Sequence, residues 1–198
     1  MEAYQIMLGK SLFTVKGFLN TLHYASPLLL TGLAIAITFK ANIFNMGVEG
    51  QLLLGGFFAG ITGASLNLSS PILEKLVCML VGIACGVLFA LIPAILRAYF
   101  HVDEMVTLML NYAMIKVLEY LSSGPFREAG SGYVCTPVIH ENAMFKRLGI
   151  ENSRLTMFFF LAFAILILMT FVMTKTRLGM EITAIGKNPD FAEATGMR

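Results

Sequence analysis

Four stretches of this 198-residue chain, each at least 20 residues long, contain no charged side chain. They cover residues 17–39, 50–73, 76–96 and 155–174. A helix needs about 20 predominantly apolar residues to cross the hydrocarbon core of a bilayer, so each stretch is long enough to span one. The pattern predicts an all-α protein built as a bundle of membrane-spanning helices.

The overall composition supports the same class. The chain is 57% hydrophobic and only 13% charged, whereas soluble domains carry about 25% charged residues. A fifth stretch, Met105 to Leu121, is apolar apart from Lys116 and Glu119. Five spans leave no room for a separate soluble domain, so we expect residues 1–198 to form one membrane domain. The net charge of +2 comes from basic residues scattered between helix ends, which does not indicate a nucleic-acid partner.

We place the expected elements by residue range. Residues 1–16 read as an amphipathic lead-in at the membrane interface, and residues 122–153 as a polar loop. The spans are expected at about 19–39, 50–68, 76–96, 105–121 and 155–174, followed by a polar, amphipathic tail over residues 175–198. Lysine and arginine are divided almost evenly between the two faces, so the positive-inside rule does not fix the orientation.

The most informative polar segment runs from Phe44 to Gln51, at the beginning of the second span. It contains Asn45, Glu49 and Gln51 together with Gly47 and Gly50. A carboxylate at membrane depth costs roughly 2.5–3.5 kcal/mol, so it usually faces a protein interior or a wet cavity. Glycine-marked breaks of this kind are where transporters place pathway and hinge elements. Glu49 therefore has two interpretations: it lines a path, or it caps the amides of the next helix.

A second polar pattern lies on the fourth span. Glu104, Thr107 and Asn111 follow steps of three and four residues, which places them on one helical face. These groups could hydrogen-bond a sugar-like solute, or Asn111 could link two helices. Lys116 and Glu119 are three residues apart and are expected to form a local ion pair.

Small residues predict close helix packing in the second and third spans. Gly56 and Gly60 form one Gly-x-x-x-Gly pattern, and Gly82 and Gly86 form another. Such pairs let neighbouring backbones approach closely, although glycine is also common in membrane helices.

The tail contains signals for one short helix. Asn188 suits an N-cap, Pro189 the first helical position, and Gly196 a C-terminal stop. Phe191, Ala192, Ala194 and Thr195 would give this helix a small apolar face. Isolated helices of two turns are unstable in water, so we expect it to dock on a partner; a plain surface loop is the alternative. Gly179 and Gly186 flank the arm that precedes it.

Signals for an enzyme are weak. Gly9, Lys10 and Ser11 end like a phosphate-binding loop, but the first glycine of that pattern would fall on Tyr4, and no strand precedes it. The three histidines are dispersed, without metal-ligand spacing. We expect no catalytic centre, no cofactor and no metal site.

Three stretches resemble the permease subunits of bacterial ABC importers, in the simple-sugar and nucleoside branch related to permeases for ribose and branched-chain amino acids. They are residues 41–51, residues 102–112, and residues 176–196 with Gly179, Gly186 and Gly196. The resemblance covers nearly the whole chain. It implies a non-enzymatic subunit that moves a nucleoside or simple sugar across the bacterial cytoplasmic membrane by alternating access.

The resemblance also implies an orientation and partners. Residues 175–198 would be cytoplasmic and residues 122–153 extracytoplasmic, facing a substrate-binding protein, and the short helix after Asn188 would be the coupling helix on an ATP-binding subunit. A second permease subunit and the lipid bilayer complete the expected surroundings. The residues expected to line or hinge the path are Asn45, Gly47, Glu49, Gly50, Gln51, Glu104, Thr107 and Asn111. The residues expected to couple to the ATPase are Gly179, Gly186, Asn188, Pro189, Phe191, Ala192, Ala194 and Gly196.

Members of this family usually have a helix before the position of Met1 and several after the coupling helix, so we expect this chain to be a fragment of a longer permease. The alternative from another class is a secondary transporter or channel that uses Glu49 and Glu104 as ion or proton sites. That alternative would require an internal repeat, and the two glycine-patterned spans share little else.

Overall fold

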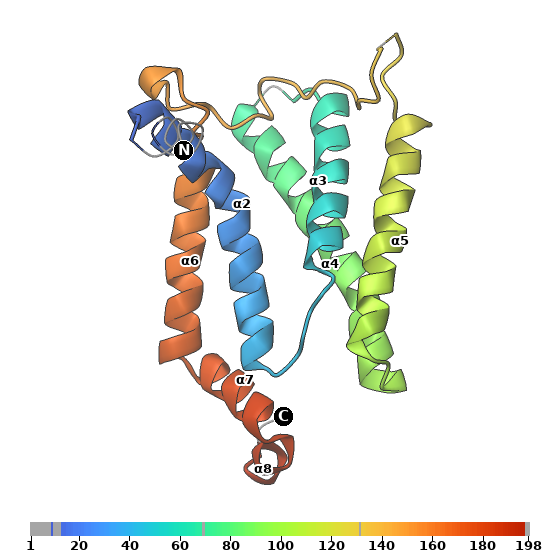
Figure 1. Ribbon diagram of the computed structural model, residues 1–198, viewed down its shortest axis with the longest axis vertical. Coiled ribbons are helices and arrows are strands. Elements are labelled where there is room, and N and C mark those ends of the chain that lie inside the picture. Colours follow the sequence, from blue (N-terminus) through green and yellow to red (C-terminus); the bar gives the residue numbers. More distant parts are fainter. Residues whose placement is uncertain (1–8, 10–12, 69, 131, 197–198) are drawn as a thin grey trace. The chain divides into compact units, whose positions relative to one another are not determined.

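The computed structural model describes residues 9, 13–68, 70–130 and 132–196. Within them the chain is all-α, as predicted, and the β-structure is an isolated bridge between Arg147 and Thr156. The long helices are α2 (Val15–Lys40), α3 (Val48–Ser65), α4 (Pro71–Phe100), α5 (Glu104–Ser123) and α6 (Phe158–Lys175) (Figure 1). A 3-10 turn, η1 (Ile150–Asn152), precedes α6, and α7 (Arg177–Lys187) and α8 (Pro189–Ala194) follow it.

Among the described residues, three helices are long and apolar enough to cross a membrane by length and composition: α2, α4 and α6. The two other predicted spans form as helices but are more polar. The first turn of α3 carries Glu49, and α5 carries Asn111, Lys116 and Glu119. All five predicted helices are therefore confirmed, while the spanning role of α3 and α5 stays a prediction.

The chain divides into two compact units. Unit one comprises residues 1–44 and 145–198 and contains α2, η1, α6, α7 and α8; unit two comprises residues 45–144 and contains α3, α4 and α5. The division falls between Phe44 and Asn45, inside the polar segment that the sequence singles out. The polar loop 122–153 likewise contributes to both units.

In unit one, α2 contacts α6 and α7 (Figure 1). Two glycines permit the close approaches of α7. A Cβ on Gly179 would lie 2.5 Å from the Cα of Met173 in α6, and one on Gly186 would lie 2.9 Å from the Cα of Ala41 at the end of α2. Any larger residue would collide with backbone at both positions, so these two predicted positions are structural contacts within this unit.

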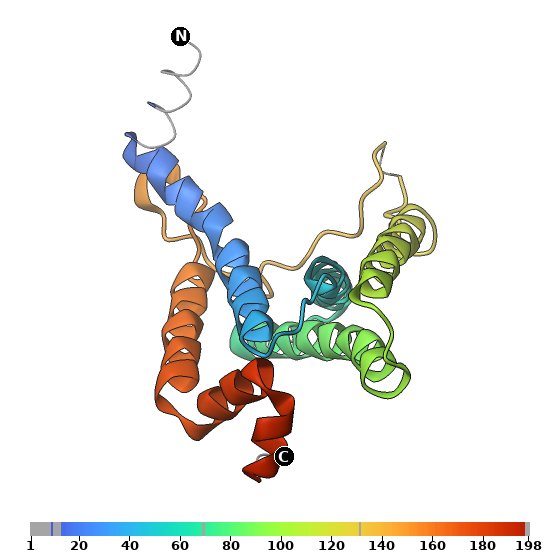
Figure 2. The ribbon, with the colours of Figure 1, turned by 60° about the horizontal axis from the view of Figure 1, so that its bottom comes forward.

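In unit two, α3 packs against α4, and Figure 2 looks nearly along α3 with α4 crossing it. The backbones approach at Gly55 and Gly82, where a Cβ on Gly55 would lie 2.6 Å from the Gly82 carbonyl oxygen. The prediction that Gly56 and Gly60 make this contact is wrong. Apart from the adjoining backbone of α3, no described atom lies within 4 Å of a Cβ built on Gly56, and a Cβ on Gly60 would meet only Ile139, at 3.8 Å. The true face is one residue earlier, because Gly55 rather than Gly56 points at α4.

The far end of α3 is covered by the loop. The His140 amide donates to the Gly63 carbonyl at 3.0 Å, and a Cβ on Gly63 would lie 3.0 Å from Ile139 and 3.3 Å from the Cys78 sulfur. One turn before Cys78 on α4, Glu74 is fully buried, and neither carboxylate oxygen has a hydrogen-bond partner among the described residues. Burial of a carboxylate without hydrogen-bond partners costs free energy, so Glu74 lowers the stability of this part of unit two.

Candidate functional site

Turns at residues 41–42 and 46–47 precede α3. Asn42 has a positive φ of 55°, and the side-chain oxygen of Asn45 accepts a hydrogen bond from the Gly47 amide at 3.0 Å. Asn side chains commonly satisfy a backbone amide two residues further on, which favours a turn over a continued helix. The polar segment is therefore a structured turn, and Asn45 has a local role in it.

Glu49 lies in the first turn of α3 and its side chain is exposed. Its Oε2 accepts a hydrogen bond from Nδ2 of Asn111 on α5, at 3.2 Å. The N-cap of α3 is Gly47, which makes no side-chain cap, and the hydrogen bond of the carboxylate goes across to α5. The alternative that Glu49 caps its own helix through a hydrogen bond is therefore wrong. The carboxylate instead accepts from the side-chain amide of Asn111 on α5.

Asn111 is the buried member of this pair, with 2% of its surface exposed. Its Oδ1 has no hydrogen-bond partner among the described residues, and it lies against Gly50. The bond to Glu49 fixes the orientation of the amide, because a carboxylate can only accept and therefore selects the amide nitrogen. The expectation that Asn111 links two helices is confirmed by this contact.

Two glycines allow α5 to reach this turn. A Cβ on Gly47 would lie 3.1 Å from the methyl carbon of Thr107, and one on Gly50 would lie 2.8 Å from the ring of Phe89 on α4. Thr107 and Asn111 therefore share one face of α5, as their spacing predicts. Phe89, 4% exposed, is a member of the cluster that the sequence does not indicate, since one aromatic residue in an apolar helix carries no periodic signal.

The remaining predicted pathway residues have different outcomes. Gln51 is half-buried, and its amide nitrogen lies 3.5 Å from a Cβ built on Gly47. Glu104 begins α5, but its side chain lies outside the described part of the chain. The structure thus gathers Asn45, Gly47, Glu49, Gly50, Gln51, Thr107 and Asn111 around the start of α3. Their role in a path stays a prediction.

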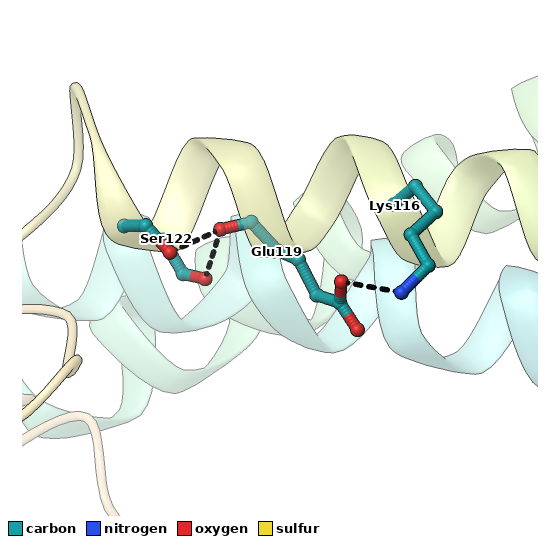
Figure 3. Close-up of polar contacts among 4 residues, drawn as sticks. Lys116, Glu119 and Ser122 are labelled. Atoms are coloured by element: carbon teal, nitrogen blue, oxygen red, sulfur yellow. Dashed lines mark hydrogen bonds and ion pairs between the residues drawn. The ribbon is translucent and has the colours of Figure 1, made fainter.

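Two other polar features of unit two lie on α5 and at its beginning. The predicted ion pair between Lys116 and Glu119 is confirmed at 2.8 Å on an exposed face (Figure 3). At the corner between α4 and α5, Arg97, His101, Val102 and Asp103 line a cavity of about 310 Å³. The His101 backbone has a φ of 52°, and Asp103 caps α5 by accepting from the Met105 amide at 3.3 Å.

The predicted tail helix is confirmed as α8. The side-chain oxygen of Asn188 accepts a hydrogen bond from the Phe191 amide at 3.0 Å, which is the N-cap that the sequence predicts. Pro189 occupies the first turn, and Gly196 has a φ of 80° just after the helix. A positive φ is easy for glycine and strained for other residues, so the helix stops there.

The apolar face of α8 is smaller than the sequence suggests. Ala192 is 1% exposed, whereas Phe191 is 60% exposed, and Ala194 and Thr195 are also exposed. Ala192 therefore attaches α8 to its own unit, and Phe191 is the large apolar side chain that α8 exposes.

Comparison with known proteins places this architecture in a family. The profile of the family described as branched-chain amino acid transport system / permease component matches residues 17–198. Among the relatives, the glucose ABC transporter permease protein TsgB13 of Haloferax volcanii is 35% identical over 100% of this chain and 54% of its own length. The nucleoside ABC transporter permease protein NupB of Lactococcus lactis subsp. cremoris is 31% identical over 98% of this chain and 56% of its own.

A third relative, the guanosine ABC transporter permease protein NupP of Bacillus subtilis, is 32% identical over 90% of this chain and 51% of its own length. The chain thus spans about half the length of these relatives. No solved structure matches it. The family match covers most of the residues described here, and the chain belongs to the permease component family of branched-chain amino acid transport systems.

Proposed function

We propose that this multi-pass protein of the cytoplasmic membrane is the permease subunit of an ATP-driven importer for a nucleoside or a simple sugar. The family match over residues 17–198 carries the proposal, and the relatives named as glucose, nucleoside and guanosine permeases suggest the solute class. The family does not favour the alternative of a secondary transporter with ion sites at Glu49 and Glu104.

The proposed partners follow from this function. A separate ATP-binding subunit hydrolyses ATP, and an extracytoplasmic substrate-binding protein delivers the solute near residues 122–153. A second permease subunit encloses the path together with this chain. Movement of α8 on the ATP-binding subunit would shift the membrane helices and alternate access between the two sides.

Within the path, we propose that Glu49 presents a hydrogen-bond acceptor to the hydroxyl groups of the solute. Its carboxylate is exposed, and one of its oxygens is held by Asn111 at 3.2 Å. A carboxylate has acceptor sites for several donors, so the bond to Asn111 orients the group without using it up. Nucleosides and sugars offer hydroxyl donors that match it.

The test is uptake of radiolabelled guanosine and glucose by the importer in proteoliposomes supplied with ATP. Glu49→Gln retains an oxygen that can accept from Asn111 but removes the charge, and we expect uptake to fall at least about tenfold, since bonds to charged groups contribute about 1.5–3 kcal/mol. Glu119→Gln is the matched control, because Glu119 pairs locally with Lys116 on an exposed face. Uptake at the full rate by Glu49→Gln would refute the proposed role of Glu49 in the path.

The coupling role of α8 has its own test. Phe191→Ser removes the exposed apolar side chain while Ala192 and the Asn188 cap keep the helix in place, and we expect it to abolish co-purification of the ATP-binding subunit. Val134→Ser, at another exposed apolar residue in the loop, should not affect co-purification. Retention of the ATP-binding subunit by Phe191→Ser would exclude this surface as the contact.

A further inference from the structure

A polar cluster in unit one joins the first part of α2 to the chain just before α6. The Arg154 backbone amide donates to the Asn20 side-chain oxygen at 2.8 Å. The Arg154 guanidinium donates through Nη1 to the Tyr24 hydroxyl at 2.7 Å. Asn20 and Tyr24 are four residues apart and share one face of α2. Arg154 is exposed, and so is 56% of Tyr24, so the cluster lies on a surface.

The unused hydrogen-bonding capacity of the cluster consists mainly of donors. The guanidinium has five N–H groups and uses one here. Tyr24 accepts with its oxygen, which leaves its own O–H to donate, and Asn20 accepts with its side-chain oxygen, which leaves its NH₂ group. Lys16, one turn before Asn20 on the same face, adds a second positive charge. The sequence of α2 contains no acidic residue, and no carboxylate among the described side chains pairs with Arg154. The ligand that complements these donors and positive charges is an anionic group with several hydrogen-bond acceptors.

Helix length places this cluster at the level of the lipid headgroups. The 26 residues of α2 extend about 39 Å at about 1.5 Å per residue, whereas the hydrocarbon core is about 30 Å thick. With Lys40 at one edge of the hydrocarbon core, about six residues at the beginning of α2 extend beyond the opposite edge, and Asn20 is the last of them. Arg154 precedes the first residue of α6 by four positions. Below the cluster, α2 exposes Leu28 over 70% of its surface, which is suitable for contact with acyl chains.

We propose that Lys16, Asn20, Tyr24 and Arg154 form a binding site for the phosphate of an anionic phospholipid. The planar guanidinium binds phosphate oxygens through paired N–H groups, and the tyrosine hydroxyl and the asparagine amide donate to the remaining oxygens. The bound lipid then bridges α2 and the segment before α6. The site lies within unit one and does not depend on which solute is transported.

The test measures phosphatidylglycerol binding to the purified full chain in nanodiscs of phosphatidylcholine with an increasing fraction of phosphatidylglycerol. Lipid retention is read by native mass spectrometry, and stabilisation by the thermal unfolding midpoint. Arg154→Gln should lower the affinity for phosphatidylglycerol at least about tenfold, and Tyr24→Phe about fivefold, from the usual strength of charged and neutral hydrogen bonds. Arg147→Gln is the matched control, since Arg147 is exposed in the same segment, and it should stay within about twofold of the unmodified chain.

Equal phosphatidylglycerol affinity for Arg154→Gln and the unmodified chain would overturn the proposal, as would an equal loss for Arg147→Gln. If Arg154→Gln does not fold, Tyr24→Phe decides, because it removes one hydroxyl and leaves the ring. Inorganic phosphate is the second probe. Displacement of the lipid by millimolar phosphate would identify a site for a free anion and overturn the lipid assignment, whereas failure to displace it supports contact with the acyl chains.

Discussion

Alanine at Gly55 or at its neighbour Gly56 adds the same methyl group to α3 in two different surroundings. At Gly55 the new Cβ would lie 2.6 Å from the Gly82 carbonyl oxygen, well inside the usual contact distance of about 3.5 Å. That oxygen belongs to the backbone of α4 and cannot rotate away, so α3 must move. At Gly56 no described atom outside the adjoining backbone of α3 lies within 4 Å of the new Cβ.

The magnitudes follow from these contacts. Overpacking a close helix contact costs about 1–3 kcal/mol, while replacing glycine by alanine inside a helix gains about 1 kcal/mol. Gly55→Ala should therefore destabilise the protein by about 1 kcal/mol, and Gly56→Ala should stabilise it by up to about 1 kcal/mol. The difference between the two variants is about 2 kcal/mol, or roughly a 30-fold change in the unfolding equilibrium.

The assay is reversible unfolding of the permease in mixed micelles, with helicity followed by circular dichroism. The free energies of unfolding of Gly55→Ala and Gly56→Ala are compared under the same conditions, so errors of extrapolation largely cancel. If Gly56→Ala is the less stable of the two, then Gly56 faces α4 and the packing described for unit two is wrong. Equal stabilities would mean that the two helices separate without cost.

Four further predictions concern single positions. Glu74→Met should raise the free energy of unfolding by about 1–3 kcal/mol. It replaces a buried carboxyl that has no hydrogen-bond partner among the described residues by an apolar side chain of similar size, and a lower free energy of unfolding in micelles would contradict this. Gly186→Val should lower the free energy of unfolding by about 1–3 kcal/mol, because its side chain would collide with the backbone at the end of α2. Gly32→Val is the control, because the space around Gly32 on α2 is open and the new side chain meets no such clash; thermal unfolding compares the two variants. Asn188→Ala should cost about 1 kcal/mol of α8 stability, seen as faster amide exchange in α8 alone. Lys116→Ala should change stability by less than about 1 kcal/mol, since its ion pair is exposed; a larger effect in chemical unfolding would show a buried role.

The positions of the helices could be predicted because lipid-compatible segments are marked by the absence of charge. Uncharged windows located the centres of α2, α4 and α6, but not their ends. The helix α4 begins at Pro71 and ends at Phe100, beyond Glu74 and Arg97, because a single charged side chain does not stop a helix. Local rules also predicted α8, since Asn188 and Gly196 act within one turn.

Contacts between distant segments were only partly predictable. The spacing of Thr107 and Asn111 indicated one polar face, yet the partner of that face, Glu49, is 62 residues away from Asn111 and is identified only by the packing. The Gly55–Gly56 pair shows the same limit, because periodicity cannot choose between adjacent glycines on a helix. The bond between Arg154 and Tyr24 spans 130 residues, and no local pattern in the sequence signals it.

The close approaches of Gly179 and Gly186 have a mechanical consequence. Near its beginning α7 lies against the end of α6, and near its end it lies against the end of α2, so α7 is held by contacts at both of its ends. A force applied through α8 would reach both contacts together, and neither α2 nor α6 would tilt independently of the other. Enlarging either glycine would lengthen one of these contacts and redirect the force, although the exposed face of α8 at Phe191 would be unchanged.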